Sequence, residues 1–391
     1  MRLHSISMAG LVGLVCLAWH SSLALAEPGV TTDRILFGQA AVLKGPAAAL
    51  GQEMRAGIRA AFEEVNRTGG VRGRELQLIS IDDGYEPNKS IEATRKLIEE
   101  DKVFALVGPV GTPTTAATQP IAAQADVPFI GPFTGAEFLR NPYQPNVVNV
   151  RGSYFQETEE MVERLTKDRG IRRISILYQD DAFGRAGLAG VQKALEKRDM
   201  ALASEGTFER NTTAVKSALL SIRKGNPEAV IMIGPYKPCA EFIKLAHQIK
   251  LNALFVNISF VGSNALAREL GLTGSGVIVT QVVPFPEDTS MPLVARYQGA
   301  MRALDPKFQP GFVSLEGYMV GRLIVMALEA IPGDPTRRSL LDTILSSSFD
   351  LGGVKLVYGA NDNQGMDNVF LTVIQPDGTF KSVTTLKEVG G

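Results

Sequence analysis

Cysteine, histidine and tryptophan are scarce in this sequence of 391 residues, which has two cysteines, three histidines and one tryptophan. A weakly basic start, a short apolar run over residues 8–19 and the small residues Ala24-Leu25-Ala26 predict a secretory signal peptide cleaved after Ala26. The mature chain then keeps one cysteine, Cys239, and one histidine, His247. Because a single cysteine cannot form an internal disulfide, we expect a large apolar core to stabilise an exported protein.

Long apolar runs and an excess of positive charge are also missing. No segment after the predicted signal peptide is long and apolar enough to cross a bilayer. Removing Arg2 from the 40 basic residues leaves 39 against 41 acidic ones, so the mature chain is close to neutral. A balanced charge argues against nucleic acid or an anionic membrane as partner. At this length two domains are expected.

Sequence motifs of catalysis and cofactor binding are absent. The loop VGPVGTPTTAATQP, residues 107–120, has two glycines and four threonines but no lysine, which excludes a triphosphate-binding loop. No GxGxxG follows a strand, and no GxSxG turn is present. A lone histidine supports neither a metal cluster nor a hydrolase triad. We therefore expect no cofactor, no metal and no enzymatic activity.

Two acidic pairs leave one alternative open. Asp82-Asp83 and Asp180-Asp181 each close a predicted strand. Short acids at such positions cap turns and helices, because they accept hydrogen bonds from backbone N–H groups. Paired acids also serve glycoside hydrolysis, so an exported hydrolase stays an alternative at this point.

Apolar strands alternate with amphipathic helices along most of the chain. Strands are predicted over 35–41, 76–81, 103–107 and 127–130, with helices over 52–66, 88–100 and 113–125. The alternation restarts with strands over 173–178, 202–208, 229–233 and 254–257 and helices over 185–198, 214–224 and 238–249. This order predicts an α/β fold of two doubly wound units with parallel sheets covered on both faces.

The last third is less regular. Strands are expected over 276–282, 354–358 and 368–374, and helices over 291–304, 313–330 and 336–346. The segment is too short for a third domain, so it is expected to complete the two sheets already begun.

Ligands of doubly wound sheets bind beyond the carboxyl ends of the strands. Gly111, Thr112 and Thr114 place amides and hydroxyls at a predicted helix N-terminus, which suits a small anion such as a carboxylate. A second such edge follows the next strand, and aromatic walls are expected from the other half of the chain. These remaining candidates are Phe133, Thr134, Gly135, Tyr154, Phe183 and Tyr236. The alternative is that these residues only cap helices or pack in the core.

An ordered set of short motifs carries a family resemblance. The set is Gly45-Pro46, Gly69-Gly70-Val71-x-Gly73, Asp82-Asp83-x-x-x-Pro87, Val107-Gly108, Pro132 and Tyr178-x-x-Asp181-x-x-Gly184. It resembles the branched-chain amino-acid-binding proteins of bacterial ABC transporters, a type I periplasmic binding protein family, over nearly all of the mature chain. The resemblance implies two Rossmann-like lobes joined by three crossovers, near residues 150–152, 280–284 and 356–360. Lobe 1 would comprise 27–150 with 282–357, and lobe 2 would comprise 151–281 with 358–391.

The resemblance also implies site residues. A ligand carboxylate would be held at Thr112 and at Phe133 to Gly135, with Tyr236 and Phe183 contributed by the second lobe. The family places a glutamate near the position of Ser259 to pair with a ligand ammonium, and here no acid is found. Glu316 is an alternative source of negative charge. A plain amino acid and a carboxylate or amide without an α-ammonium group are therefore equally open.

The main hypothesis is a periplasmic receptor that closes around a small carboxylate-bearing metabolite and delivers it to a membrane permease, without breaking a bond. We expect a monomer. A ligand-sensing module of the same fold, acting through a receptor or regulator, is the second hypothesis. An exported hydrolase is the third.

Overall fold

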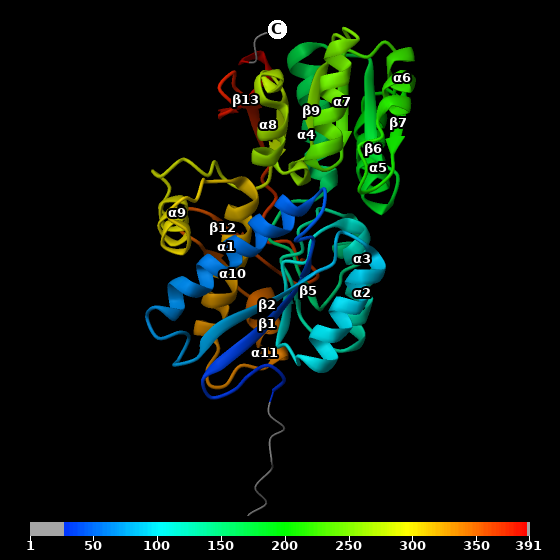
Figure 1. Ribbon diagram of the computed structural model, residues 1–391. Helices are drawn as coiled ribbons and strands as arrows, with labels where there is room; N and C mark the ends of the chain where they lie inside the picture. The colour runs from blue at the N-terminus through cyan, green and yellow to red at the C-terminus, as the bar shows by residue number, and fades with distance from the viewer. Residues whose placement is uncertain (1–26, 389–391) are drawn as a thin grey trace, which may run out of the picture.

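The computed structural model describes residues 27–388. The predicted signal peptide lies outside these residues. The described chain forms two α/β bodies stacked end to end (Figure 1). We call the body that contains the N-terminal sheet lobe 1 and the other lobe 2. Within the described residues, no helix has the length and apolar character needed to cross a membrane.

Lobe 1 is built on a five-stranded parallel sheet in the order β2-β1-β3-β4-β5. Most of β1 is buried, as expected for a strand covered on both faces. The strands are β1 (Arg34–Ala41), β2 (Glu75–Asp82), β3 (Ala105–Val107), β4 (Phe129–Ile130) and β5 (Val147–Val148). The helices are α1 (Ala48–Asn66), α2 (Pro87–Arg95), α3 (Thr112–Gln124), α9 (Pro292–Leu304), α10 (Phe312–Ala330) and α11 (Arg337–Leu345).

Lobe 2 is built on a seven-stranded sheet in the order β14-β13-β10-β9-β8-β6-β7. Its strands are β6 (Ile174–Gln179), β7 (Glu205–Phe208), β8 (Ala229–Ile233), β9 (Leu254–Asn257), β10 (Ile278–Gln281), β13 (Phe370–Ile374) and β14 (Phe380–Val383). Its helices are α4 (Tyr154–Glu163), α5 (Ala182–Glu196), α6 (Lys216–Lys224), α7 (Tyr236–Gln248) and α8 (Ser263–Leu270). A separate hairpin joins β11 (Ser348–Asp350) to β12 (Lys355–Val357).

The chain passes between the lobes three times, between β5 and α4, between β10 and α9, and between β12 and β13. The predicted fold class of two doubly wound lobes is confirmed. The expectation of purely parallel sheets is wrong at one edge, because β13 pairs antiparallel with both β10 and β14. The connection from β13 to β14 is a short turn in which the Gln375 amide donates to the Thr379 carbonyl, and so short a connection can only join antiparallel neighbours.

Some elements differ from the sequence prediction. The expected helix over 88–100 ends as α-helix at Arg95 and continues as one π-helical turn, Lys96–Glu100. Helix α4 was not predicted, although Ser153 and Gln156 form a capping box at its start. Such a box is a recognisable sequence signal, but the charged residues of α4 obscured its apolar stripe.

Helices α1 and α10 cross at close range in lobe 1. A Cβ added at Gly57 would lie 2.0 Å from the Ser314 carbonyl oxygen, and one at Gly317 would lie 2.3 Å from the Met54 carbonyl oxygen. Only glycine permits such an approach of two backbones. This contact fixes α10 against α1 and so places Phe312 and Glu316 at the carboxyl ends of the lobe 1 strands.

Candidate functional site

Three hydroxyl groups meet where the lobes face each other. The Thr112 and Thr134 Oγ1 atoms are 2.7 Å apart, and Thr134 Oγ1 lies 3.3 Å from the Tyr154 hydroxyl. All three residues are buried. Thr112 opens α3, Thr134 follows β4 and Tyr154 opens α4, so the group combines two helix N-termini from different lobes. We call Thr112, Thr134 and Tyr154 the hydroxyl cluster; its hydroxyls can donate to an anion near the N-terminus of α3.

The neighbouring candidates hold this arrangement. Thr114 Oγ1 donates to the carbonyl oxygens of Val110 (2.5 Å) and Gly111 (2.9 Å), so its hydroxyl is bound within its own turn. Gly111 has a φ of 103°, and a Cβ there would lie 2.2 Å from the Tyr85 ring. The Gly135 carbonyl accepts a 2.7 Å hydrogen bond from the Tyr154 amide. Of the two loop threonines, Thr112 contributes to the cluster and Thr114 shapes the loop.

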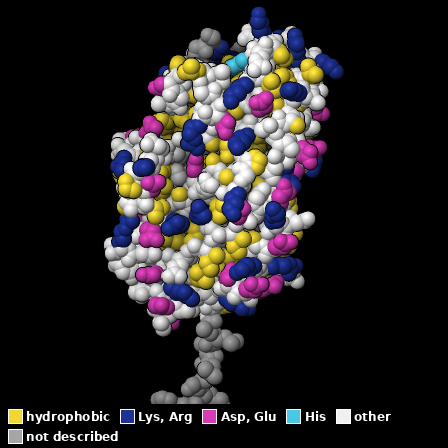
Figure 2. All heavy atoms as spheres, in the orientation of Figure 1, with side chains coloured by type: hydrophobic (Ala, Val, Ile, Leu, Met, Phe, Trp, Pro, Cys, Tyr) yellow, Lys and Arg dark blue, Asp and Glu magenta, His cyan; other side chains and the backbone are white. Residues whose placement is uncertain are grey.

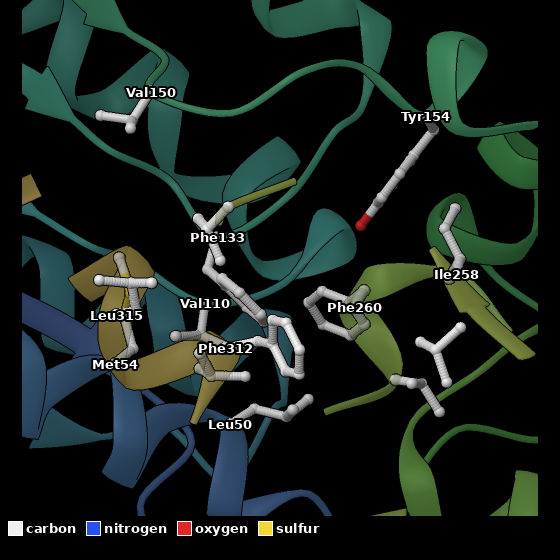
Figure 3. Close-up of a cluster of buried hydrophobic side chains, with 14 of the residues drawn as sticks. Leu50, Met54, Val110, Phe133, Val150, Tyr154, Ile258, Phe260, Phe312 and Leu315 are labelled. Carbon is white, nitrogen blue, oxygen red and sulfur yellow. The ribbon is translucent and has the colours of Figure 1, made fainter. Parts of the chain in front are cut away.

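An aromatic cluster joins the two lobes, and Figure 3 shows Phe133, Phe260 and Tyr154. The Phe260 ring, which follows β9 in lobe 2, has its centroid 4.6 Å from Phe183, 5.2 Å from Phe133 and 6.1 Å from Tyr85. Phe133 and Tyr85 belong to lobe 1, so Phe260 inserts between the lobes. Tyr154 packs on Phe183 at 5.5 Å. Of the three expected aromatic walls, Tyr154 and Phe183 lie together here with Phe133 of lobe 1, and a ligand contact of these rings stays a prediction.

Tyr236 contacts the opposite lobe at another point. Its hydroxyl accepts a hydrogen bond of 3.4 Å from the Ala49 amide of lobe 1. Tyr236 opens α7 and is buried. It therefore forms part of the interface at the start of α1.

A buried arginine lies on the first crossover. Arg151 is fully buried, and its Nη2 lies 3.1 Å from Glu157 Oε1 and also contacts Ser259 Oγ. Its guanidinium lies 5.1 Å from the centre of the Phe133 ring and 5.9 Å from that of Tyr154. The Glu157 carboxylate also accepts hydrogen bonds from the Ser259 amide (2.9 Å), Ser259 Oγ (2.9 Å) and Thr280 Oγ1 (2.6 Å). Ser259 is thus bound to Glu157.

Glu316 faces Arg151 from lobe 1. Its Oε2 lies 3.7 Å from Arg151 Nη1, and the two residues are almost completely buried. Burial raises the pKa of Glu316 to about 7, although Arg151 acts in the opposite direction. Glu316 Oε1 and the Nε and Nη1 atoms of Arg151 have no hydrogen-bond partner within the protein. This centre therefore keeps unmet hydrogen-bonding capacity between the lobes.

Three of the four paired acids act as caps, and Asp180 instead pairs with Arg185. Asp82 Oδ1 accepts from the amides of Leu43 and Gly84, and Asp83 accepts from the Tyr85 amide and the Ser90 hydroxyl. Asp181 caps α5 by accepting from the Phe183 amide. These contacts match the capping interpretation of the sequence analysis.

Sequence reasoning missed Arg151, Glu157 and Phe260. The sequence did contain a signal for Arg151. It is a charged residue at the predicted crossover, and it follows a mostly apolar stretch, residues 147–150. Glu157 follows Tyr154 by three residues, a helical spacing that puts both on one face. The only sequence signal for Phe260 was its place after a predicted strand. A phenylalanine at that place is as typical of a hydrophobic core as of a binding site.

The geometry is that of two lobes closed on a polar centre with aromatic walls. A family model described as periplasmic binding protein matches residues 35–379. The chain belongs to the periplasmic binding protein family. Within the described part of the chain, no group of His, Cys, Asp and Glu is arranged to hold a metal ion.

Relatives of this periplasmic binding protein are solute-binding proteins. A Leu/Ile/Val-binding protein of Rhizobium johnstonii is 28% identical over 60% of this chain and 62% of that protein, so the match spans about three fifths of its length. A structure from Rhodopirellula baltica, described as a possible leucine/isoleucine/valine-binding protein, is 39% identical with a TM-score of 0.88 and covers 94% of this chain and 100% of that chain. A solute-binding protein of R. palustris in complex with benzoate is 21% identical, with a TM-score of 0.79 over 90% and 95% of the two chains, and shows the same fold.

Proposed function

We propose that this protein is the periplasmic receptor of an ABC transporter, which captures a small carboxylate-bearing metabolite between its lobes and delivers it to a membrane permease. The hydroxyl cluster carries the proposal. It joins hydroxyls of the first residues of α3 and α4, and the two helices belong to different lobes. A carboxylate bound there would contact both lobes at once, and a ligand that favours the closed state in this way drives hinge closure.

Charge and relatives support this function. Lysine, arginine and acidic side chains are interspersed over the visible face in Figure 2, which agrees with the near-neutral sequence. Relatives of the chain are named as binding leucine, isoleucine and valine, and one protein of the same fold binds benzoate. All of these ligands carry a carboxylate. The proposal includes that the protein is exported, acts as a monomer and has no catalytic activity.

A binding experiment tests the function. Co-purified ligand is removed by unfolding and refolding, and amino acids and small organic acids are then screened by thermal shift and calorimetry. A ligand present at a hundred times its Kd should stabilise the folded protein by about 2.7 kcal/mol. If no compound of either class raises the melting temperature, the proposed function is wrong.

A matched pair of variants tests the hydroxyl cluster. Thr112→Val removes one of its hydroxyls with little change in shape, and we expect ligand affinity to fall at least tenfold, since a lost hydrogen bond to a charged group costs about 1.5–3 kcal/mol. Thr213→Val, on an exposed loop of lobe 2, is the control and should bind normally. Equal affinity of both variants would place the carboxylate elsewhere.

A further inference from the structure

The end of β9 carries an aromatic side chain. Phe260 follows Ser259 there and is fully buried between the lobes, in contact with Phe133, Phe183 and Tyr85. Ser259 itself is occupied by Glu157. This side of the site is therefore an apolar wall rather than a receptor for a positive charge.

The nearest acids are already matched by protein groups. Four donors reach the Glu157 carboxylate, which is about as many as its oxygens accept. Asp181 accepts from the Phe183 amide, Gln179 and Arg210. Of the acids named at the site, only Glu316 keeps an unpartnered oxygen, and it shares its surroundings with the positive charge of Arg151.

An ammonium group would be unfavourable beside Arg151. Two like charges repel strongly where water is excluded, and an incompletely paired ammonium also loses its hydration. The unmet donors, in contrast, favour an acceptor-rich ligand: Arg151 Nε and Nη1 are both buried without a hydrogen-bond partner, and each can donate to a carboxylate oxygen. Glu316 in its protonated form adds a further donor, which its raised pKa allows near neutral pH.

We propose that the ligand is an apolar carboxylate without an α-ammonium group, such as a 2-oxo acid or an arylcarboxylate, with its carboxylate in reach of Arg151 and its apolar body against Phe260. This inference rests on the proposed function, because it names the substrate class of the same site. It separates this chain from a receptor for the amino acids themselves.

Matched ligand pairs test the inference. Calorimetry on the ligand-free protein compares phenylpyruvate with phenylalanine, and 4-methyl-2-oxopentanoate with leucine, with benzoate as a fifth probe. Each pair shares one carbon skeleton and differs only in the oxo or ammonium group. We expect at least one acid without ammonium to bind ten times or more tighter than its amino-acid partner, or benzoate to bind tighter than both amino acids.

The outcomes separate the two proposals. Tighter binding of leucine or phenylalanine overturns the inference and leaves the receptor function standing. If none of the five probes and no other carboxylate binds, both proposals are wrong.

Glu316→Gln adds an independent measurement. The amide keeps a donor and the shape of the side chain and carries no negative charge, so the affinity for the preferred acid should rise rather than fall. An ammonium held by the Glu316 carboxylate would instead lose its counter-charge, and amino-acid binding would fall by a hundredfold or more. If the unmodified protein prefers an amino acid and Glu316→Gln loses that affinity by a hundredfold or more, the inference is also overturned.

Discussion

Arg151 shows how one side chain can define a centre between two lobes. It leaves the backbone at the first crossover and meets Glu157 of lobe 2 and Glu316 of lobe 1. A buried ion pair of this kind adds little net stability, because desolvation of the charges offsets their attraction. Its fully buried position with two nitrogens that lack a hydrogen-bond partner fits a role in binding.

Glu316 gives a prediction of pH dependence. Its pKa is about 7 in the folded protein and 4.5 for an ordinary glutamate, so the folded state binds more protons between these values. Stability therefore falls as pH rises from about 4.5 to about 7, and Glu316→Gln should escape this loss. Between pH 4.5 and pH 7, the free energy of unfolding of the variant should rise by about 2 kcal/mol relative to that of the unmodified protein. Urea unfolding midpoints at pH 4.5, 6 and 8 measure this difference. Arg140, Arg151 and Glu157 also act on this carboxyl and are unchanged in the variant. A difference that stays constant with pH would contradict the prediction.

Helix α10 shows how packing of whole elements positions the site. Its 19 residues are mostly buried, and it lies against α1 through glycines on both helices. Because the helices touch backbone to backbone, a shift of α10 would displace both Phe312 and Glu316.

Two glycine substitutions test this packing. Gly57→Ala forces apart α1 and α10, and we expect it to destabilise the protein by about 3 kcal/mol. Gly299→Ala is the matched control, since Gly299 lies on the exposed face of α9 with no neighbouring atom within 4 Å of an added Cβ. It should raise stability by about 0.5–1 kcal/mol, through its higher helix propensity. Denaturant unfolding midpoints measure the stability change of each variant. If the two variants change stability equally, α1 and α10 are not in close contact at Gly57.

At the scale of the molecule, a polar contact outside the site also joins the lobes. Arg210 of lobe 2 contacts Glu86 of lobe 1 at 2.9 Å and Asp181 of its own lobe at 3.0 Å. Asn211 donates to the Gly84 carbonyl at 3.1 Å and to Glu86 Oε1 at 2.7 Å. The bonds to Glu86 and Gly84 cross between the lobes, so they favour the closed state.

Arg210→Ala tests this contact. We expect ligand affinity to fall three- to tenfold and the radius of gyration in solution to increase, because closure is less favourable. Arg185→Ala is the control, since Arg185 pairs with Asp180 within lobe 2 and both side chains are exposed. Calorimetry and small-angle scattering measure the two effects. If both variants behave alike, the contact has no part in closure.

The sequence by itself determined the two α/β lobes, the strand ends that carry the site and the hydroxyl-bearing loop, because local periodicity and strand–helix alternation encode them. The antiparallel edge and the helices α4 and α8 were missed, and the residue limits of the lobes stay a prediction. Only the tertiary structure brought Arg151, Glu157, Glu316 and Phe260 together, since their contacts join segments as far apart as 165 positions. No local pattern records which side chains meet across a closed interface, because that depends on how two independently folded sheets are placed against each other.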